Sequence, residues 1–238
     1  MASHINSVLK QAILTFTSKP ELFTPNLNAL AALLDKTTAE DVNLQPQFST
    51  ESLWSRPGKA PVTCIDIYED QNITMGIFIL KPGGHLPLHN HPEMYGLIKV
   101  ISGKVRITSY SLNTPKTLEV DRRSFKDDPP PALVFSRKKI LTAELVSSEI
   151  VDTSSKPCML EPNDKNLHEI ESVDGPAAFL DILAPPYSTL IPNNGPRLCS
   201  YFAVLSQVSP NVFKLQEIKS PSWYWNDMFP YTGPEPKL

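Results

Sequence analysis

Apolar residues at the start of the chain recur at helical spacing. In residues 3–18 they fall three or four positions apart, and Ser3 is suited to cap the resulting helix. A second stripe predicts a helix over residues 26–35, and Thr37 with Glu40 suggests a capping box for a short third turn. We expect all three apolar stripes to be packing surfaces, most simply against the outside of a barrel.

From residue 62 onward the hydrophobic period becomes two, which is typical of strands. The segments 62–68 and 73–80 flank a polar turn and predict a hairpin. A second hairpin is expected between 97–101 and 104–110 across Ser102-Gly103, followed by a polar surface excursion over 111–137. Further strand candidates are 140–146, 159–160, 167–170, 179–183 and 198–205. Many short strands with turn residues between them predict an all-β sandwich or barrel.

Composition supports a single soluble domain. The chain has 238 residues, of which 41% are hydrophobic and 20% charged, so it can bury a sizeable core. Its 24 prolines against 9 glycines indicate many rigid loops. With no linker apparent, we expect a helical segment over 1–45 to pack on a β domain over 46–238.

Charge and cysteine content exclude several partners. A net charge of −3 gives no reason to expect nucleic acid or an anionic membrane, and the basic clusters Arg122-Arg123 and 137–139 read as solvated surface. No apolar run is long enough to span a membrane, and the N-terminus lacks the apolar core of a secretory signal. Three widely spaced cysteines favour a reducing compartment. We expect a cytoplasmic location, with nuclear or mitochondrial location as alternatives.

The strongest chemical signal is His89-Asn90-His91. In an extended backbone these two histidines point to one face, and proline at positions 87 and 92 favours that backbone. Two imidazoles at this spacing suit Fe, Zn, Cu or Ni, although two solvated strand histidines would look the same. With Gly83 before the pair and Gly103 after the next strand, the segment resembles the first motif of cupin β-barrels.

The cupin pattern is incomplete, because Tyr95 and Gly96 occupy the places of the usual glutamate ligand. Glu93 follows a proline and is expected to be solvated, so a third ligand must lie elsewhere. His168 is the only histidine after position 91, but the proline and glycine that precede the second cupin histidine are out of register or missing. Spacing alone leaves this assignment open. His4 and His85 are weaker candidates.

Several motifs, in order, resemble the thiol dioxygenases of the 2-aminoethanethiol dioxygenase and plant cysteine oxidase type. They are LPLHNHPEM at 86–94, GLIKVISGKVRI at 96–107, His168, GPAAFLDILAPPY at 175–187, Cys199-Ser200-Tyr201 and PYTGP at 230–234. The resemblance spans about residues 40–234. It implies a cupin-type double-stranded β-helix with Fe(II) held by His89, His91 and His168. One departure is Glu93, where the family usually has glycine.

The resemblance also implies a reaction. Both atoms of O2 would be added to the sulfur of cysteamine or of a protein's N-terminal cysteine, which would give the sulfinic acid and make the enzyme an oxygen sensor feeding a degradation signal. Alternatives are a Zn or Ni cupin that acts as an isomerase or hydrolase, and a non-catalytic cupin binding protein. We expect a monomer.

The resemblance implies four further catalytic residues, of which Asp181 and Tyr187 match family positions that line the substrate pocket. Asp181 lies in an apolar strand, so its carboxylate needs a partner: a substrate ammonium, a histidine N–H or the backbone. Tyr187 matches a second pocket position. Cys199 and Tyr201 resemble a pair that can form a covalent crosslink, although two core side chains in simple contact would give the same pattern.

Overall fold

Two strands of 18 residues each, β4 (Tyr95–Leu112) and β7 (Leu167–Ala184), run antiparallel along the centre of the fold. The structure is a computed structural model that describes residues 3–112 and 140–238. The pairing extends from Tyr95 opposite Ala184 to Tyr110 opposite Leu167. These two strands therefore connect the two ends of the barrel.

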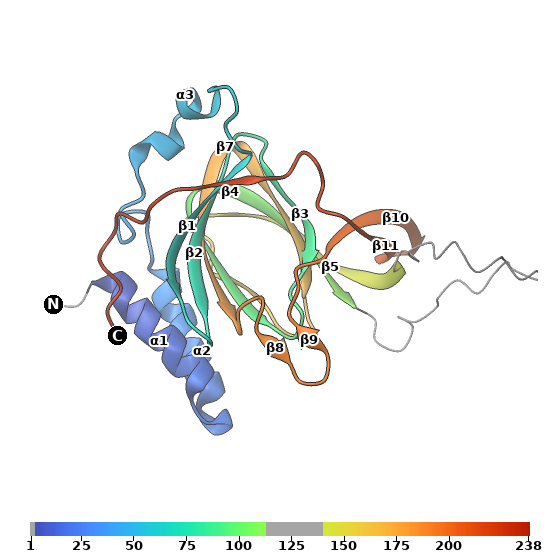
Figure 1. Ribbon diagram of the computed structural model, residues 1–238, viewed down its shortest axis with the longest axis horizontal. Helices are drawn as coiled ribbons and strands as arrows, with labels where there is room; N and C mark the ends of the chain where they lie inside the picture. The colour runs from blue at the N-terminus through green and yellow to red at the C-terminus, as the bar shows by residue number, and fades with distance from the viewer. Residues whose placement is uncertain (1–2, 113–139) are drawn as a thin grey trace, which may run out of the picture.

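Figure 1 shows the other helices and strands of the fold. The helices are α1 (His4–Thr17), α2 (Pro20–Asp35), a 3₁₀ turn η1 (Pro46–Ser49) and α3 (Glu51–Trp54). The other strands are β1 (Val62–Glu69), β2 (Thr74–Leu80), β3 (His85–Asn90), β5 (Ile140–Asp152), β6 (Cys158–Leu160), β8 (Leu190–Ile191), β9 (Gly195–Pro196), β10 (Tyr201–Ser209), β11 (Val212–Ile218) and β12 (Asn226–Met228).

Six strands close into a ring in the order β7, β3, β10, β11, β5, β4 and back to β7. On the edge of β7 away from β4, the first part of the strand pairs with β3 and the second part pairs with β2. The sheet then continues from β2 through β1 to β12. Closure satisfies backbone groups that an open edge would leave unpaired. The prediction of a β-rich barrel with helices outside it is confirmed.

The N-terminal helices cover the β1–β2 side of the barrel, as Figure 1 shows. The expected apolar stripes are buried: Ile5, Val8, Leu9 and Ala12 of α1, and Leu27, Leu30 and Leu34 of α2. Helix α2 begins six residues earlier than predicted, because Pro20 suits the first turn of a helix and the helix continues through Pro25. Within residues 3–112 and 140–238, no helix is long and apolar enough to cross a membrane.

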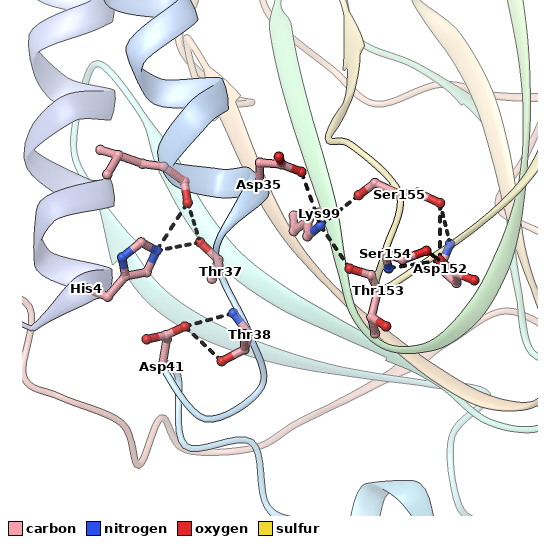
Figure 2. A network of polar contacts seen from close by, with 11 residues as sticks. His4, Asp35, Thr37, Thr38, Asp41, Lys99, Asp152, Thr153, Ser154 and Ser155 are labelled. Carbon is pink, nitrogen blue, oxygen red and sulfur yellow. Dashed lines mark hydrogen bonds and ion pairs between the residues drawn. The ribbon is translucent and has the colours of Figure 1, made fainter.

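Polar contacts fix these helices to the barrel (Figure 2). Lys99 of β4 is 2% exposed, and its ammonium donates to the carbonyl oxygens of Thr153 at 3.1 Å and Ser155 at 2.7 Å. Asp35, at the end of α2, lies 3.7 Å from the same nitrogen. A buried ammonium needs such partners, so Lys99 connects α2 to the turn that follows β5.

The start of the chain is fixed in a similar way. His4 contacts the carbonyl oxygen of Leu33 and the hydroxyl of Thr37, which accounts for this histidine as a structural one. The capping box expected at Thr37 and Glu40 is wrong: the Thr38 backbone and hydroxyl donate to Asp41 in a turn.

The hairpin expected across Ser102-Gly103 is also wrong, because β4 continues through it. Gly103 has a φ of +68° at a register shift, so it forms an irregularity within a long strand and no reversal. For the same reason 167–170 and 179–183 are two parts of β7, which continues through the positive φ angles of Asp174 and Gly175.

Other strand predictions need smaller changes. Strand β6 begins at Cys158, one residue earlier than predicted, and the candidate at 198–205 begins only at Tyr201. The strands β8, β9, β11 and β12 were not predicted. The excursion over 111–137 and both basic clusters fall outside the described residues, except that Ser111 and Leu112 end β4.

We predict that Gly103→Ala destabilises the protein far more than Gly58→Ala. Both glycines have similar positive φ angles, +68° and +74°. A methyl group at Gly103 would overlap the Pro176 carbonyl oxygen, whereas nothing lies within 4 Å of the same position at Gly58. Urea unfolding should show a loss of about 1 kcal/mol for Gly58→Ala and at least twice that for Gly103→Ala. Equal losses would contradict the assigned close contact.

Candidate metal centre

Three histidine rings converge at one end of the β3–β7 pair. The ring centroids of His89, His91 and His168 lie 4.7–4.8 Å from one another, and their potential ligand nitrogens all lie within 4.8 Å. His89 and His168 are direct cross-strand partners. The structure thus brings together the two histidines of the H-x-H motif and the one that spacing alone left open.

His89 is placed by an irregularity in β3. The register between β3 and β7 shifts between Leu86 and His89, where Pro87 has no N–H to contribute to the ladder. Because a carbonyl oxygen can only accept, Nδ1–H of His89 donates to the Pro87 carbonyl oxygen at 2.8 Å. The Nε2 atom of His89 therefore carries a lone pair that is free to bind a metal.

His91 lies just beyond β3 and is held by two segments. Its backbone N–H donates to the Asn166 carbonyl oxygen at 3.0 Å, and the Asn166 amide donates back to the His91 carbonyl oxygen. The Tyr187 hydroxyl donates to the Asn90 carbonyl oxygen at 2.6 Å. This hydrogen bond uses the only proton of the Tyr187 hydroxyl. In the 3.0 Å contact between Tyr187 and His91, the hydroxyl oxygen must therefore accept, and Nδ1–H of His91 is the donor. Nε2 of His91 is then also unprotonated.

Burial keeps all three imidazoles neutral. It lowers the pKa of His89 to about 4 and lowers the pKa values of His91 and His168 well below their ordinary value. The Nε2 atoms of His91 and His168 are only 3.1 Å apart. Two lone pairs at this distance repel each other unless a cation or a proton lies between them.

The donor set fits a first-row transition metal. Two nitrogens 3.1 Å apart can each lie about 2.1 Å from one ion, the usual metal–imidazole distance. Imidazole donors suit Fe, Zn, Cu and Ni and disfavour Mg or Ca. Nδ1–H groups that donate to Pro87 and Tyr187 are the outer contacts that orient metal-bound histidines.

A cavity of about 230 Å³ opens beside the three rings. Its walls are largely apolar or aromatic and include Phe179, Ile170 and Tyr224. All four substrate-side residues predicted from the sequence lie on it: Asp181, Tyr187, Cys199 and Tyr201. The structure therefore brings the predicted ligands and the predicted pocket residues into one site.

Asp181 is a buried acid, 8% exposed, and no hydrogen-bond donor reaches its Oδ1. Burial raises the pKa of Asp181 to about 7. Of the partners considered from the sequence, a backbone N–H at this oxygen is therefore excluded. A carboxylate in this environment favours an incoming cation.

Cys199 and Tyr201 line the same cavity. Burial raises the pKa of the Cys199 thiol and that of the Tyr201 hydroxyl. The backbone N–H of Ser200 donates to the Asn90 side chain at 2.8 Å, so the residue between the two histidines positions this segment. The covalent crosslink between Cys199 and Tyr201 stays a prediction.

Sequence reasoning missed the two asparagines. Asn90 and Asn166 contribute no metal ligand but fix His91, Ser200 and Tyr187 in place. The available signal was position: each asparagine lies within two residues of a candidate ligand. Glu93 is exposed with a φ of +53° and lies outside the cluster, which accords with the expected solvated role.

His85 and Tyr95 face away from the centre. The ring of His85 stacks on Trp223, and its Nε2 lies 3.3 Å from Glu169. Tyr95, where a cupin glutamate was sought, packs against Phe16 and Phe23 of the helices. Neither belongs to the histidine cluster.

A profile of one protein family, PCO_ADO, matches residues 33–235, which include all three histidines. The chain belongs to the PCO_ADO family. It is 35% identical to the 2-aminoethanethiol dioxygenase of Homo sapiens, over 99% of this chain and 97% of that protein. It is 29% identical to plant cysteine oxidase 1 of Arabidopsis thaliana, over 74% of this chain and 54% of that protein. The resemblance drawn from the motifs is thereby confirmed.

Solved structures similar to this PCO_ADO member are more distant. A Klebsiella pneumoniae protein with a double-stranded β-helix domain has a TM-score of 0.34 at 14% identity, over 57% of this chain and 82% of that one. A cupin superfamily protein from Desulfitobacterium hafniense also has a TM-score of 0.34, at 12% identity, over 58% of this chain and 89% of that one. The fold predicted from the sequence was also a cupin-type barrel. The similarity to these two structures is too low to indicate a function.

We predict that Tyr187→Phe weakens metal binding without removing it. The variant keeps the ring but loses the acceptor for Nδ1–H of His91, so the wrong tautomer becomes accessible. Loss of such an outer contact typically costs 10- to 100-fold in metal affinity. Competition titration with a chelator would measure this. Tyr68→Phe, which removes a remote hydroxyl contact to Asp70, is the matched control; equal affinities in both variants would contradict the tautomer assignment.

The raised pKa of Asp181 predicts a pH-dependent stability difference. Between its ordinary pKa of 3.8 and the folded value of about 7, the folded state binds the proton more tightly, so stability falls as pH rises through this window. The Asp181→Asn variant has no ionisable group at this position, so it does not lose stability through this ionisation. In metal-free protein, the variant should therefore gain stability over the parent by about 3 kcal/mol between pH 5 and pH 8. Denaturant unfolding at both pH values measures it, with the exposed Asp66→Asn as the control.

Proposed function

We propose that this chain is an Fe(II)-dependent thiol dioxygenase. Its substrate would be a 2-aminothiol, either cysteamine or the N-terminal cysteine of a protein, and its product the sulfinic acid. The balanced reaction converts R–SH and O2 into R–SO2H, so the thiol itself supplies the electrons. The observation that carries this proposal is the three neutral histidines beside an apolar cavity that also holds an unpartnered buried acid.

Family membership supports the reaction class. Relatives named 2-aminoethanethiol dioxygenase align with nearly the whole chain, and relatives named plant cysteine oxidase align with 74% of it. Both names describe oxidation of a small aminothiol or of cysteine. An oxidoreductase that acts on a thiol is therefore the function that the comparisons favour.

The all-histidine ligand set suits a thiol substrate. His89, His91 and His168 carry no charge, so a bound ion keeps its full positive charge and favours an anionic ligand from the substrate. When bound there, Fe(II) would supply the redox chemistry by which O2 oxidises the sulfur. The chain's own part is to keep the three imidazoles neutral and oriented, through Pro87 and Tyr187.

Asp181 suits the amino group of the substrate. Its Oδ1 is buried without a hydrogen-bond donor, and the wall of the cavity that it lines is largely apolar by area. An ammonium that enters the cavity would lower the pKa of Asp181 and form an ion pair in a poorly solvated place. The same acid would bind neither a thiol without an amine nor a carboxylate, so it would select 2-aminothiols.

Cavity size permits both kinds of substrate. Cysteamine has four heavy atoms, and a water molecule takes about 30 Å³ in the liquid. A cavity of about 230 Å³ therefore has room for more than cysteamine. The remaining space would admit the first peptide unit of a chain that begins with cysteine.

The proposal extends to regulation. Because O2 is consumed, the rate of sulfinic acid formation would follow O2 concentration, and oxidation of an N-terminal cysteine would mark a protein for degradation. A monomer acting in the cytoplasm would suffice for this role.

The test is direct oxidation of two substrates. Metal-free chain is loaded with Fe(II) under anaerobic conditions and then exposed to air with cysteamine or a peptide that begins with cysteine. Mass spectrometry should show a gain of two oxygen atoms on sulfur. His168→Ala should lose both iron and turnover, whereas His85→Ala, on the same barrel but outside the cluster, should retain them. Full activity in His168→Ala would overturn the ligand assignment, and activity with Zn alone would overturn the reaction.

Control substrates separate the role of Asp181 from that of the metal. In 2-mercaptoethanol a hydroxyl replaces the amine of cysteamine, so the parent enzyme should oxidise it at a much lower kcat/KM. Asp181→Asn should lose most of this preference, mainly through a raised KM for cysteamine. An unchanged preference in the variant would exclude Asp181 as the ammonium partner.

A further inference from the structure

A second cavity, of about 480 Å³, lies at the start of β4 and shares no wall residue with the cavity beside the three histidines. Phe16 and Phe23 border it from the helices, Gln71 from the β1–β2 turn, and Tyr95 and Pro185 from the barrel. Its size is in the range of small-molecule sites. Nothing in the proposed thiol oxidation uses this space.

Its walls select for one kind of ligand. Phe16, Phe23 and Tyr95 contact one another with ring centroids 5.0–6.0 Å apart and planes tilted by 38–58°. None of the side chains that line it is charged. Of the five polar ones, Thr15, Ser18 and Asn72 already have hydrogen-bond partners within the chain, so the Gln71 amide and the Tyr95 hydroxyl are the groups that offer hydrogen bonds. An ion would find no opposite charge on these walls, whereas an aromatic ring would gain tilted contacts with three rings. We propose that this cavity binds a neutral aromatic small molecule with one polar group.

The cavity is coupled to the metal centre through two short paths. Tyr95 follows Met94, whose backbone N–H donates to the His91 carbonyl oxygen at 3.2 Å. Tyr95 is also the cross-strand partner of Ala184, a further wall residue. Pro185 comes next, two residues before Tyr187, the hydrogen-bond partner of the His91 ring. A ligand that moves Tyr95 or Pro185 therefore changes the orientation of His91 and hence the affinity for metal.

Binding is tested with indole as the probe, on the full chain without metal. Isothermal titration should give saturable binding to the parent. Phe23→Ala removes one wall, and Gln71→Trp fills the space from an exposed turn; each should weaken binding at least tenfold. Leu22→Ala, the exposed neighbour on the same helix, should bind as the parent does. No saturable binding to the parent, or undiminished binding to Gln71→Trp, would overturn the site.

Coupling is tested with Co(II), whose visible spectrum reports binding at the histidines. Saturating indole should change the Co(II) dissociation constant at least threefold in the parent and leave it unchanged in Gln71→Trp. Reciprocity requires Co(II) to change indole affinity by the same factor. An equal Co(II) affinity with and without indole would overturn the coupling. Neither measurement requires turnover, so their failure is distinct from failure of the proposed reaction.

Discussion

The cross-strand pairing of β3 with β7 is the constraint on which the centre depends. It places His89 opposite His168, and the register shift at Pro87 sets which side chains of β3 face the cavity. Side chains alternate along a strand, so a slip of one residue would turn the His89 ring away from the cavity. The Asn166 contacts then bring His91 to the same point. One local alignment thus determines all three ligands.

Electrostatics explains why such a centre can remain folded before any ion binds. Three imidazoles kept neutral by burial carry no mutual charge repulsion, and their Nδ1–H groups at His89 and His91 have acceptors. Asp181 has a pKa near 7, so it can carry a proton when no cation is present. Neutral imidazoles and a protonated acid need no counter-ion, and a cation between the Nε2 atoms of His91 and His168 would relieve the repulsion of their lone pairs.

Local pattern predicted what local physics determines. The helical stripes, the β1–β2 hairpin and the H-x-H geometry follow from spacing within a few residues. The prediction of a hairpin at Ser102-Gly103 was wrong because the direction of the strand there depends on its contact with Pro176 and Ala177, more than 70 residues away in the sequence. His168 could not be chosen by spacing, since its partner is fixed by pairing with β3; the family motifs identified it. The roles of Asn90 and Asn166 depend on three-dimensional contacts that leave no periodic signal.

The replacement of the cupin glutamate by Tyr95 has a structural consequence beyond the loss of one ligand. An anionic ligand there would reduce the net positive charge of an ion held by the three histidines. A tyrosine instead directs its ring outward, where Phe16 and Phe23 of the N-terminal helices cover it. Position 95 therefore matters in two ways: it contributes no charged ligand to the centre, and its side chain packs against the N-terminal helices. Because β4 begins at this residue, four positions after His91, and pairs along its length with β7, the helical segment contacts the strand that follows the H-x-H motif. The helices are in this sense part of the support of the site.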